Sequence, residues 1–146
     1  VTDWTITGFT TDTIQCGLRT ILGGTKSSST NSISVLLSNL PNHFRIRVRA
    51  QFIIFNTPST LAKKATITIG STTNSTDFNS TGYSHETCLG RNYITLATDM
   101  TISHSGASDT LVFDTDVDYH WGIRDIIITV WKCASNCSTC TGYLAT

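Results

Sequence analysis

Alternation of apolar and polar positions is the strongest pattern along this chain. Every second residue from 44 to 54 is apolar, and Arg45, Arg47 and Arg49 stand between these apolar positions. A period of two over this length is typical of a β-strand with one buried face and one open face. The pattern therefore predicts a long strand that carries three arginines in a row on the face away from the core.

The same period recurs along the chain and predicts an all-β protein. Strong alternation or apolar runs mark residues 65–69, 110–113 and 121–131, and weaker ones mark 4–9, 14–22, 32–37 and 93–103. Gly-rich or polar runs between them predict turns and loops at 23–24, 25–31, 56–59, 71–83 and 105–109. β-Branched residues dominate and no segment follows a 3.6-residue period, so helix is disfavoured. We expect an antiparallel β-sandwich of jelly-roll type.

The segment 121–131 is expected at the centre of one sheet, beside the strand that carries the three arginines. It contains Ile126, Ile127 and Ile128 in succession. Successive residues of a strand point to opposite faces, so three consecutive isoleucines predict that both faces of this strand are covered.

The composition changes only near the C-terminus. With 146 residues the chain fits one domain. Residues 1–132 are predicted to form the β-sandwich, and residues 133–146, which are small, polar and Cys-rich, to form a tail or linker. The chain begins with Val1 and lacks a basic-then-apolar leader, which favours a processed chain or a piece of a longer one.

Charge and composition argue against nucleic acid and a membrane span and favour an extracellular location. The formal net charge is zero and only 14% of the residues are charged, whereas Ser and Thr make up roughly three residues in ten. A nucleic-acid binder would be basic, and no apolar run reaches the roughly 20 residues that span a bilayer. A surface solvated by hydroxyl groups instead favours a secreted or cell-surface glycoprotein.

Five cysteines strengthen the extracellular interpretation. In a Ser/Thr-rich chain of this size they indicate disulfides, with one cysteine left over or paired outside the chain. Cys16 and Cys88 can bridge each other, or one of them can reach the tail. A three-cysteine metal site is the weaker alternative. The five are Cys16, Cys88, Cys133, Cys137 and Cys140.

Three short motifs resemble a domain common in large surface proteins of ciliates and related protists. They are Leu-Pro-x-His followed by the alternating strand at 40–47, His-Ser followed by a strand at 104–113, and Trp-Gly-Ile-x-Asp at 121–125. In that family the domain often precedes furin-receptor-like Cys-rich repeats, which Cys133, Cys137 and Cys140 resemble. The resemblance implies a jelly-roll-like extracellular domain of adhesion, coat or fibril proteins, without enzyme activity. The family's Asp-Ser-Trp-Asp stretch is replaced here by residues 56–59, Asn-Thr-Pro-Ser.

The sequence contains no local catalytic motif: nucleophile elbow, zincin helix, phosphate loop and dinucleotide fingerprint are all missing. We therefore predict no enzyme activity and no cofactor. A calcium ion is considered as well as the cysteine metal site, because Asp114, Asp116 and Asp118 alternate before Trp121 and calcium prefers oxygen ligands. The alternative is that these carboxylates only face solvent together at the end of a strand.

Two sets of side chains are candidate binding groups. Arg45, Arg47 and Arg49 could bind a carboxylate, an acidic glycan or an acidic strand of a partner. The alternative is pairing within the domain with an acid such as Asp125. The three tryptophans, Trp4, Trp121 and Trp131, either stack on sugars or fill the core.

Three Asn-x-Ser/Thr sequons predict N-glycosylation at Asn74, Asn79 and Asn136. Two of them share the polar run 71–83, which we expect to be an exposed loop.

Two functions remain open. The first is a structural module that self-associates into a coat or fibril or joins neighbouring domains of a longer chain. The second is a lectin-like module that binds glycans. The odd number of cysteines and the hydroxyl-rich surface favour the first.

Overall fold

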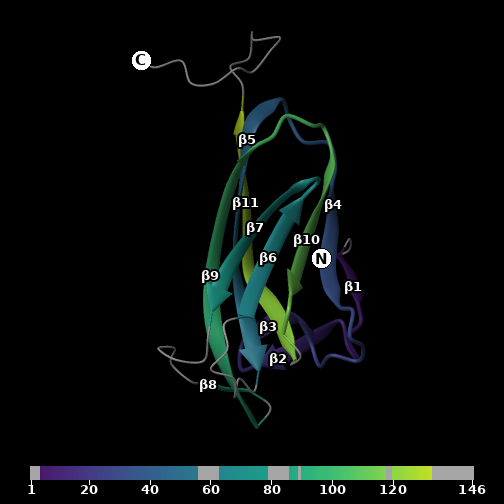
Figure 1. The fold of residues 1–146 in the computed structure, drawn as a ribbon, viewed down its shortest axis with the longest axis vertical. Coiled ribbons are helices and arrows are strands. Elements are labelled where there is room, and N and C mark those ends of the chain that lie inside the picture. Colours follow the sequence, from purple (N-terminus) through teal and green to yellow (C-terminus); the bar gives the residue numbers. More distant parts are fainter. Residues whose placement is uncertain (1–3, 56–62, 79–85, 89, 118–119, 133–146) are drawn as a thin grey trace.

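The protein is described by a computed structural model that covers residues 4–55, 63–78, 86–88, 90–117 and 120–132. These residues form two antiparallel sheets packed face to face, which confirms the predicted β-sandwich (Figure 1). One sheet contains β1 (Trp4–Thr7), β4 (Ser32–Leu37), β10 (Asp109–Thr115), β6 (Lys63–Ile69) and β7 (Thr72–Phe78), in that order. The other contains β2 (Thr13–Cys16), β3 (Arg19–Gly24), β11 (Trp121–Lys132), β5 (His43–Phe55), β9 (Arg91–Ser103) and β8 (Glu86–Cys88).

The arginine-bearing strand lies where the sequence predicts it. β5 is an interior strand of the six-stranded sheet, with β11 on one side and β9 on the other. Its alternate residues Ile46, Val48, Phe52 and Ile54 are fully buried between the two sheets. The arginines consequently point to the opposite side of this sheet, which we call the outward face.

Aromatic rings fill the centre of the sandwich. The Trp121 ring is fully buried and stacks on Phe52, with 5.8 Å between ring centroids, while Phe9 meets it edge-on at 5.2 Å. Phe52 also contacts Phe113 of the facing sheet, at 5.9 Å. The Trp121 Nε1–H donates a hydrogen bond to the Asn31 side-chain oxygen, so the polar edge of the buried ring is satisfied.

Three predicted segments differ in detail. The single strand expected at 14–22 is a hairpin of β2 and β3, because Gly17 adopts a positive φ of 63° and turns the chain. Gly23 and Gly24 lie within β3 and not in a turn. The polar run 71–83, expected as a loop, contains the edge strand β7. Five of the seven β7 residues are exposed, so the alternation of apolar and polar residues that predicts a strand is weak here.

The prediction that both faces of β11 are covered is wrong. The strand bulges between Arg124 and Ile127, with Asp125 at a φ of 51°, and in the described residues β3 pairs with it only as far as Ile123. Ile127 and Ile128 are 48% and 36% exposed. Beyond the bulge, β11 keeps β5 as its partner, and no described strand pairs with its other edge.

A disulfide joins the two edges of the six-stranded sheet. Cys16 lies in β2 and Cys88 in β8, and their Cα atoms are 5.3 Å apart. In a flat sheet, strands separated by five interstrand spacings would lie roughly 24 Å apart. The sheet is therefore rolled at this end, around a second apolar cluster that includes Ile21, Ile53, Phe55 and Tyr93.

The last described strand, β11, ends at Lys132, and residues 133–146, which are predicted to form a tail or linker, lie outside the described part. Across the described residues, the structure has no helix of the length and hydrophobicity that a membrane span requires.

Candidate ligand-binding surface

The outward face of the six-stranded sheet presents rows of side chains across β11, β5 and β9. One row joins Trp131, Arg45 and Ser103, and the next joins Thr129, Arg47 and Thr101. The third joins Ile127, Arg49 and Asp99, and the fourth, next to the rolled end, joins Arg124, Gln51 and Ala97. The face therefore combines an aromatic ring, cations, one carboxylate and hydroxyl groups.

Arg47 is bound by an acid of the same face. Its Nε donates to Asp99 Oδ1 at 2.8 Å, and its Nη2 donates to Asp99 Oδ2. These hydrogen bonds lower the pKa of Asp99 and raise the pKa of Arg47. The sequence analysis offered pairing within the domain as an alternative, and one arginine does pair, but with Asp99. Asp125 instead lies 3.3 Å from Arg19.

Arg45 and Arg49 are arranged differently. Arg49 is exposed, and neither an ion pair nor a hydrogen bond ties its guanidinium to another described side chain. The Arg45 guanidinium carbon lies 5.9 Å from the centre of the Phe44 ring, a cation–π contact. Two of the three arginines are thus available to a ligand.

Arg124 is the arginine of this face that the sequence analysis did not single out. It is buried, and its Nε donates a 3.0 Å hydrogen bond to Gln51 Oε1. Its position two residues before the tripled isoleucines obscured the alternation that would have placed it on the outward face.

The three tryptophans divide between the two predicted roles. Trp121 is in the core, whereas Trp131 is partly exposed and lies on the outward face next to Arg45. Trp4 is partly buried at the open side of the sandwich, beside a groove of about 350 Å³ that Leu22, Ile123 and Ile128 also line.

Two of the three aspartates considered for calcium bind backbone amides. Asp114 Oδ1 accepts from the Thr115 N–H at 2.7 Å, and Asp116 Oδ1 accepts from the Lys64 N–H at 2.6 Å. Asp118 lies outside the described residues, and no three potential metal ligands cluster within the described part. Calcium binding stays a prediction.

The predicted glycosylation and disulfide residues are only partly described. Asn74 is exposed on β7, an edge strand, so a glycan there would cover a sheet edge. Asn79 and Asn136 lie outside the described residues, as do Cys133, Cys137 and Cys140. The Cys16–Cys88 bridge is present, which selects one of the two pairings considered for these cysteines.

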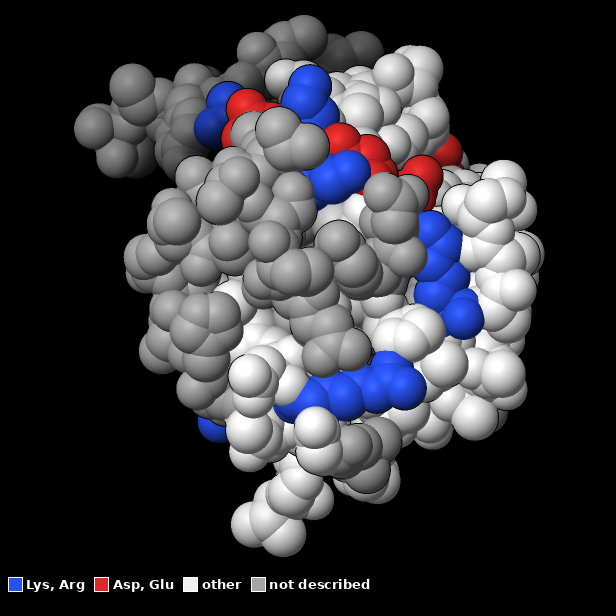
Figure 2. Space-filling view, turned by 60° about the horizontal axis from the view of Figure 1, so that its bottom comes forward, with Lys and Arg blue, Asp and Glu red and all other residues white. Residues whose placement is uncertain are grey.

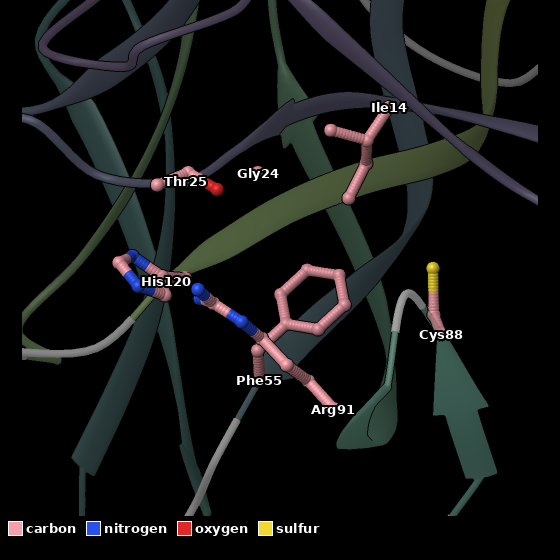
Figure 3. Close-up of a pocket in the computed structure, with 7 residues that line it drawn as sticks. All are labelled: Ile14, Gly24, Thr25, Phe55, Cys88, Arg91 and His120. Atoms are coloured by element: carbon pink, nitrogen blue, oxygen red, sulfur yellow. The ribbon is translucent and has the colours of Figure 1, made fainter.

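A small pocket opens at the rolled end of the sheet (Figure 3). It has a volume of about 140 Å³, and the described residues that line it are Ile14, Gly24, Thr25, Phe55, Cys88, Arg91 and His120. Figure 2 is turned so that this end of the molecule comes forward: acidic and basic side chains lie next to one another in the upper part of the view, and a further basic group lies below them.

Comparison with known proteins identifies the fold but not a family. Neither protein-family models nor curated protein sequences match the chain. Among solved structures, the CBM22-1 xylan-binding domain from Paenibacillus barcinonensis Xyn10C is similar, with a TM-score of 0.55 and 14% sequence identity. The alignment covers 90% of this chain and 88% of that domain. At this identity the similarity establishes a shared β-sandwich jelly-roll architecture.

Proposed function

We propose that this domain is a non-enzymatic, extracellular glycan-binding module, and that its outward face is the binding surface. The observation that carries the proposal is the row Trp131–Arg45–Ser103, continued by the Arg47–Asp99 pair and by Arg49. None of these side chains lies in the main core between the sheets.

The chemistry of this face suits a sugar chain. A pyranose ring has an apolar face that stacks on an indole such as Trp131, and hydroxyl groups that bind planar, charge-assisted partners. Arg47 and Asp99 hold each other in place, so their free lone pair and N–H positions are preorganised for such hydroxyls. Arg49 adds a cation that a ligand can bind without displacing a partner.

The structural comparison supports the choice of ligand class. The similar solved domain is a xylan-binding domain. A shared architecture at 14% identity carries no residue correspondence, so the proposal concerns glycans as a class and leaves out xylan itself. The Cys16–Cys88 disulfide fits an oxidising, extracellular compartment.

Assembly into a coat or fibril is the second candidate. The open edge of β11 beyond Ile123 and the exposed Ile127 and Ile128 favour it, since an unpaired apolar edge can add a strand from another copy. Sedimentation of the domain at increasing concentration tests this role. Self-association that Ile128→Lys abolishes would support it, and a monomer at all concentrations would contradict it.

The glycan-binding proposal is tested by a glycan array followed by titration calorimetry with the best ligand. Trp131→Ala should weaken binding by about tenfold or more, since a lost stacking contact removes roughly 1.5 kcal/mol. Arg49→Ala should also weaken it. Lys64→Ala, an exposed change on the other sheet, is the matched control and should leave affinity unchanged.

Two results would contradict this proposal. One is an array without any bound glycan. The other is a neutral glycan whose affinity Trp131→Ala and Arg49→Ala leave at the parent value, because that glycan would then occupy another surface.

A further inference from the structure

The pocket at the rolled end of the six-stranded sheet has the features of an anion site. Arg91 lies at the start of β9, and its side chain extends past Phe55 toward His120 (Figure 3). No described residue forms an ion pair or a hydrogen bond with the Arg91 guanidinium, and none of the described lining residues is acidic. Among the described residues, the positive charge of Arg91 in this pocket is therefore uncompensated.

His120 adds a hydrogen-bond donor, because the tautomer of its ring is fixed. The backbone N–H of Lys26 donates to His120 Nδ1 at 2.9 Å, so in the neutral ring the proton resides on Nε2. Burial, Arg91 and Lys26 all lower the pKa of His120, so the ring is neutral at pH 7. Its Nε2–H is then a hydrogen-bond donor in a pocket that already contains a guanidinium.

The other residues that line the pocket supply one polar group and an apolar wall. Thr25 supplies a hydroxyl group, while Ile14 and Phe55 supply an apolar wall next to the Cys16–Cys88 bridge. A volume of about 140 Å³ is well below the roughly 300–1,000 Å³ of ordinary ligand pockets, so a whole sugar chain does not fit. A small charged group with a few attached carbons does.

We propose that this pocket binds a single carboxylate, namely that of a uronic acid unit of an acidic glycan. One planar guanidinium binds the two oxygens of a carboxylate, and its single positive charge balances the single charge of a carboxylate but not the double charge of a phosphate monoester. The sugar ring would lie against the apolar wall, and the rest of the glycan would leave through the pocket mouth. This proposal deepens the proposed glycan binding, but its site is separate from the outward face.

Calorimetric titration with sodium glucuronate and with glucose tests the proposal, because the two sugars differ in the carboxylate. We expect glucuronate to bind and glucose to bind at least about tenfold more weakly, given the strength of charge-assisted bonds. Acetate, which has the carboxylate without the ring, should compete with glucuronate at high concentration. Equal affinity for glucose and glucuronate, or no competition by acetate, would overturn the proposal.

Two substitutions at Arg91 locate the site. Arg91→Gln should weaken glucuronate binding at least about tenfold, and Arg91→Lys should weaken it less, because the charge remains and the planar fork is lost. Lys64→Gln removes one positive charge from an exposed position of the other sheet and is the matched control; it should bind glucuronate like the parent. Arg91→Lys keeps the test decisive even if Arg91→Gln fails to fold.

One result with the two Arg91 variants would contradict the placement of the carboxylate site. If both Arg91 variants melt like the parent and bind glucuronate with parental affinity, the carboxylate binds elsewhere.

The two glycan proposals fail in distinguishable ways. Trp131→Ala should reduce binding of long glycans and leave glucuronate binding intact. Arg91→Gln should reduce glucuronate binding and leave the binding of neutral glycans intact. Loss of glucuronate binding in Trp131→Ala as well would show that there is one site and would overturn the separate pocket.

Discussion

At the scale of single residues, each member of the Trp-Gly-Ile-x-Asp motif has a structural role. Trp121 is stacked in the core and bonded to Asn31. Gly122 allows close approach, since a Cβ there would lie 2.4 Å from the Leu22 carbonyl oxygen. Ile123 is buried, and Asp125 takes the left-handed conformation at the bulge. The motif specifies how β11 packs against β3 and carries no chemistry of its own.

Trp121→Ala should destabilise the protein strongly. Truncating a fully buried tryptophan costs about 3–5 kcal/mol, and the Asn31 side-chain oxygen would also lose its donor. Urea denaturation measures the change in the free energy of unfolding. Trp131→Ala, at a partly exposed site, should cost clearly less, and equal costs for both variants would contradict these assignments of the two rings.

His120 should make folding less favourable in mild acid. Its pKa is lowered in the folded protein, so below the ordinary value near 6.5 the unfolded chain binds a proton that the folded protein does not. The free energy of unfolding should therefore fall as the pH drops from about 7 toward 5. In His120→Gln the fall should be smaller when both proteins are denatured with urea at each pH. Parallel pH profiles for the two proteins would contradict this.

At the scale of elements, two of the motifs found in the sequence meet in space. His43, at the start of β5, is buried, and its Nε2 lies 2.8 Å from the His104 Nδ1 at the end of β9. His104 Nε2 lies 3.2 Å from Asp109 Oδ2 at the start of β10. This chain of side chains ties the two sheets together at the end opposite the disulfide (Figure 1).

The bulge in β11 depends on the backbone of Asp125. At a φ of 51° a β-branched residue is strained, so Asp125→Val should destabilise the protein by roughly 1–2 kcal/mol. Asp125→Gly is the control: glycine tolerates this conformation, and both variants lose the Asp125 contacts with Arg19 and Arg124 equally. Thermal melting ranks the variants. A valine variant as stable as the glycine variant would contradict a strained bulge.

At the scale of the whole molecule, the disulfide determines the shape of the six-stranded sheet. It joins strands at opposite edges and closes a loop with a sequence separation of 72 residues. It also lies beside the pocket that contains Arg91 and His120. The rolled end and the pocket therefore depend on the same bond.

The Cys16→Ala, Cys88→Ala double variant should be less stable by roughly 4 kcal/mol on chain-entropy grounds, given the length of the closed loop. The sandwich core should persist, because it is built from residues between the sheets, away from the bridge. Circular dichroism and urea denaturation check both statements. Unchanged stability would mean that the bond contributes little beyond the strand pairing.

The amino-acid sequence by itself determined the class of fold and the core of the long strands. A period of two is a local property, so residues 44–54 identify their own buried face whatever their neighbours are. It likewise determined the strands at 32–37 and 93–103. The candidate outward-face arginines followed from the same period.

Tertiary structure alone decided the partners. Asp99 reaches Arg47 because β5 and β9 pair in one register among many, and no local pattern specifies a register between strands 52 residues apart. The bulge at Asp125 shifts the alternation in β11, which explains why three consecutive isoleucines do not cover both faces. The pocket forms only because the sheet rolls until Cys16 meets Cys88, which brings Ile14, Arg91 and His120 together from three distant segments.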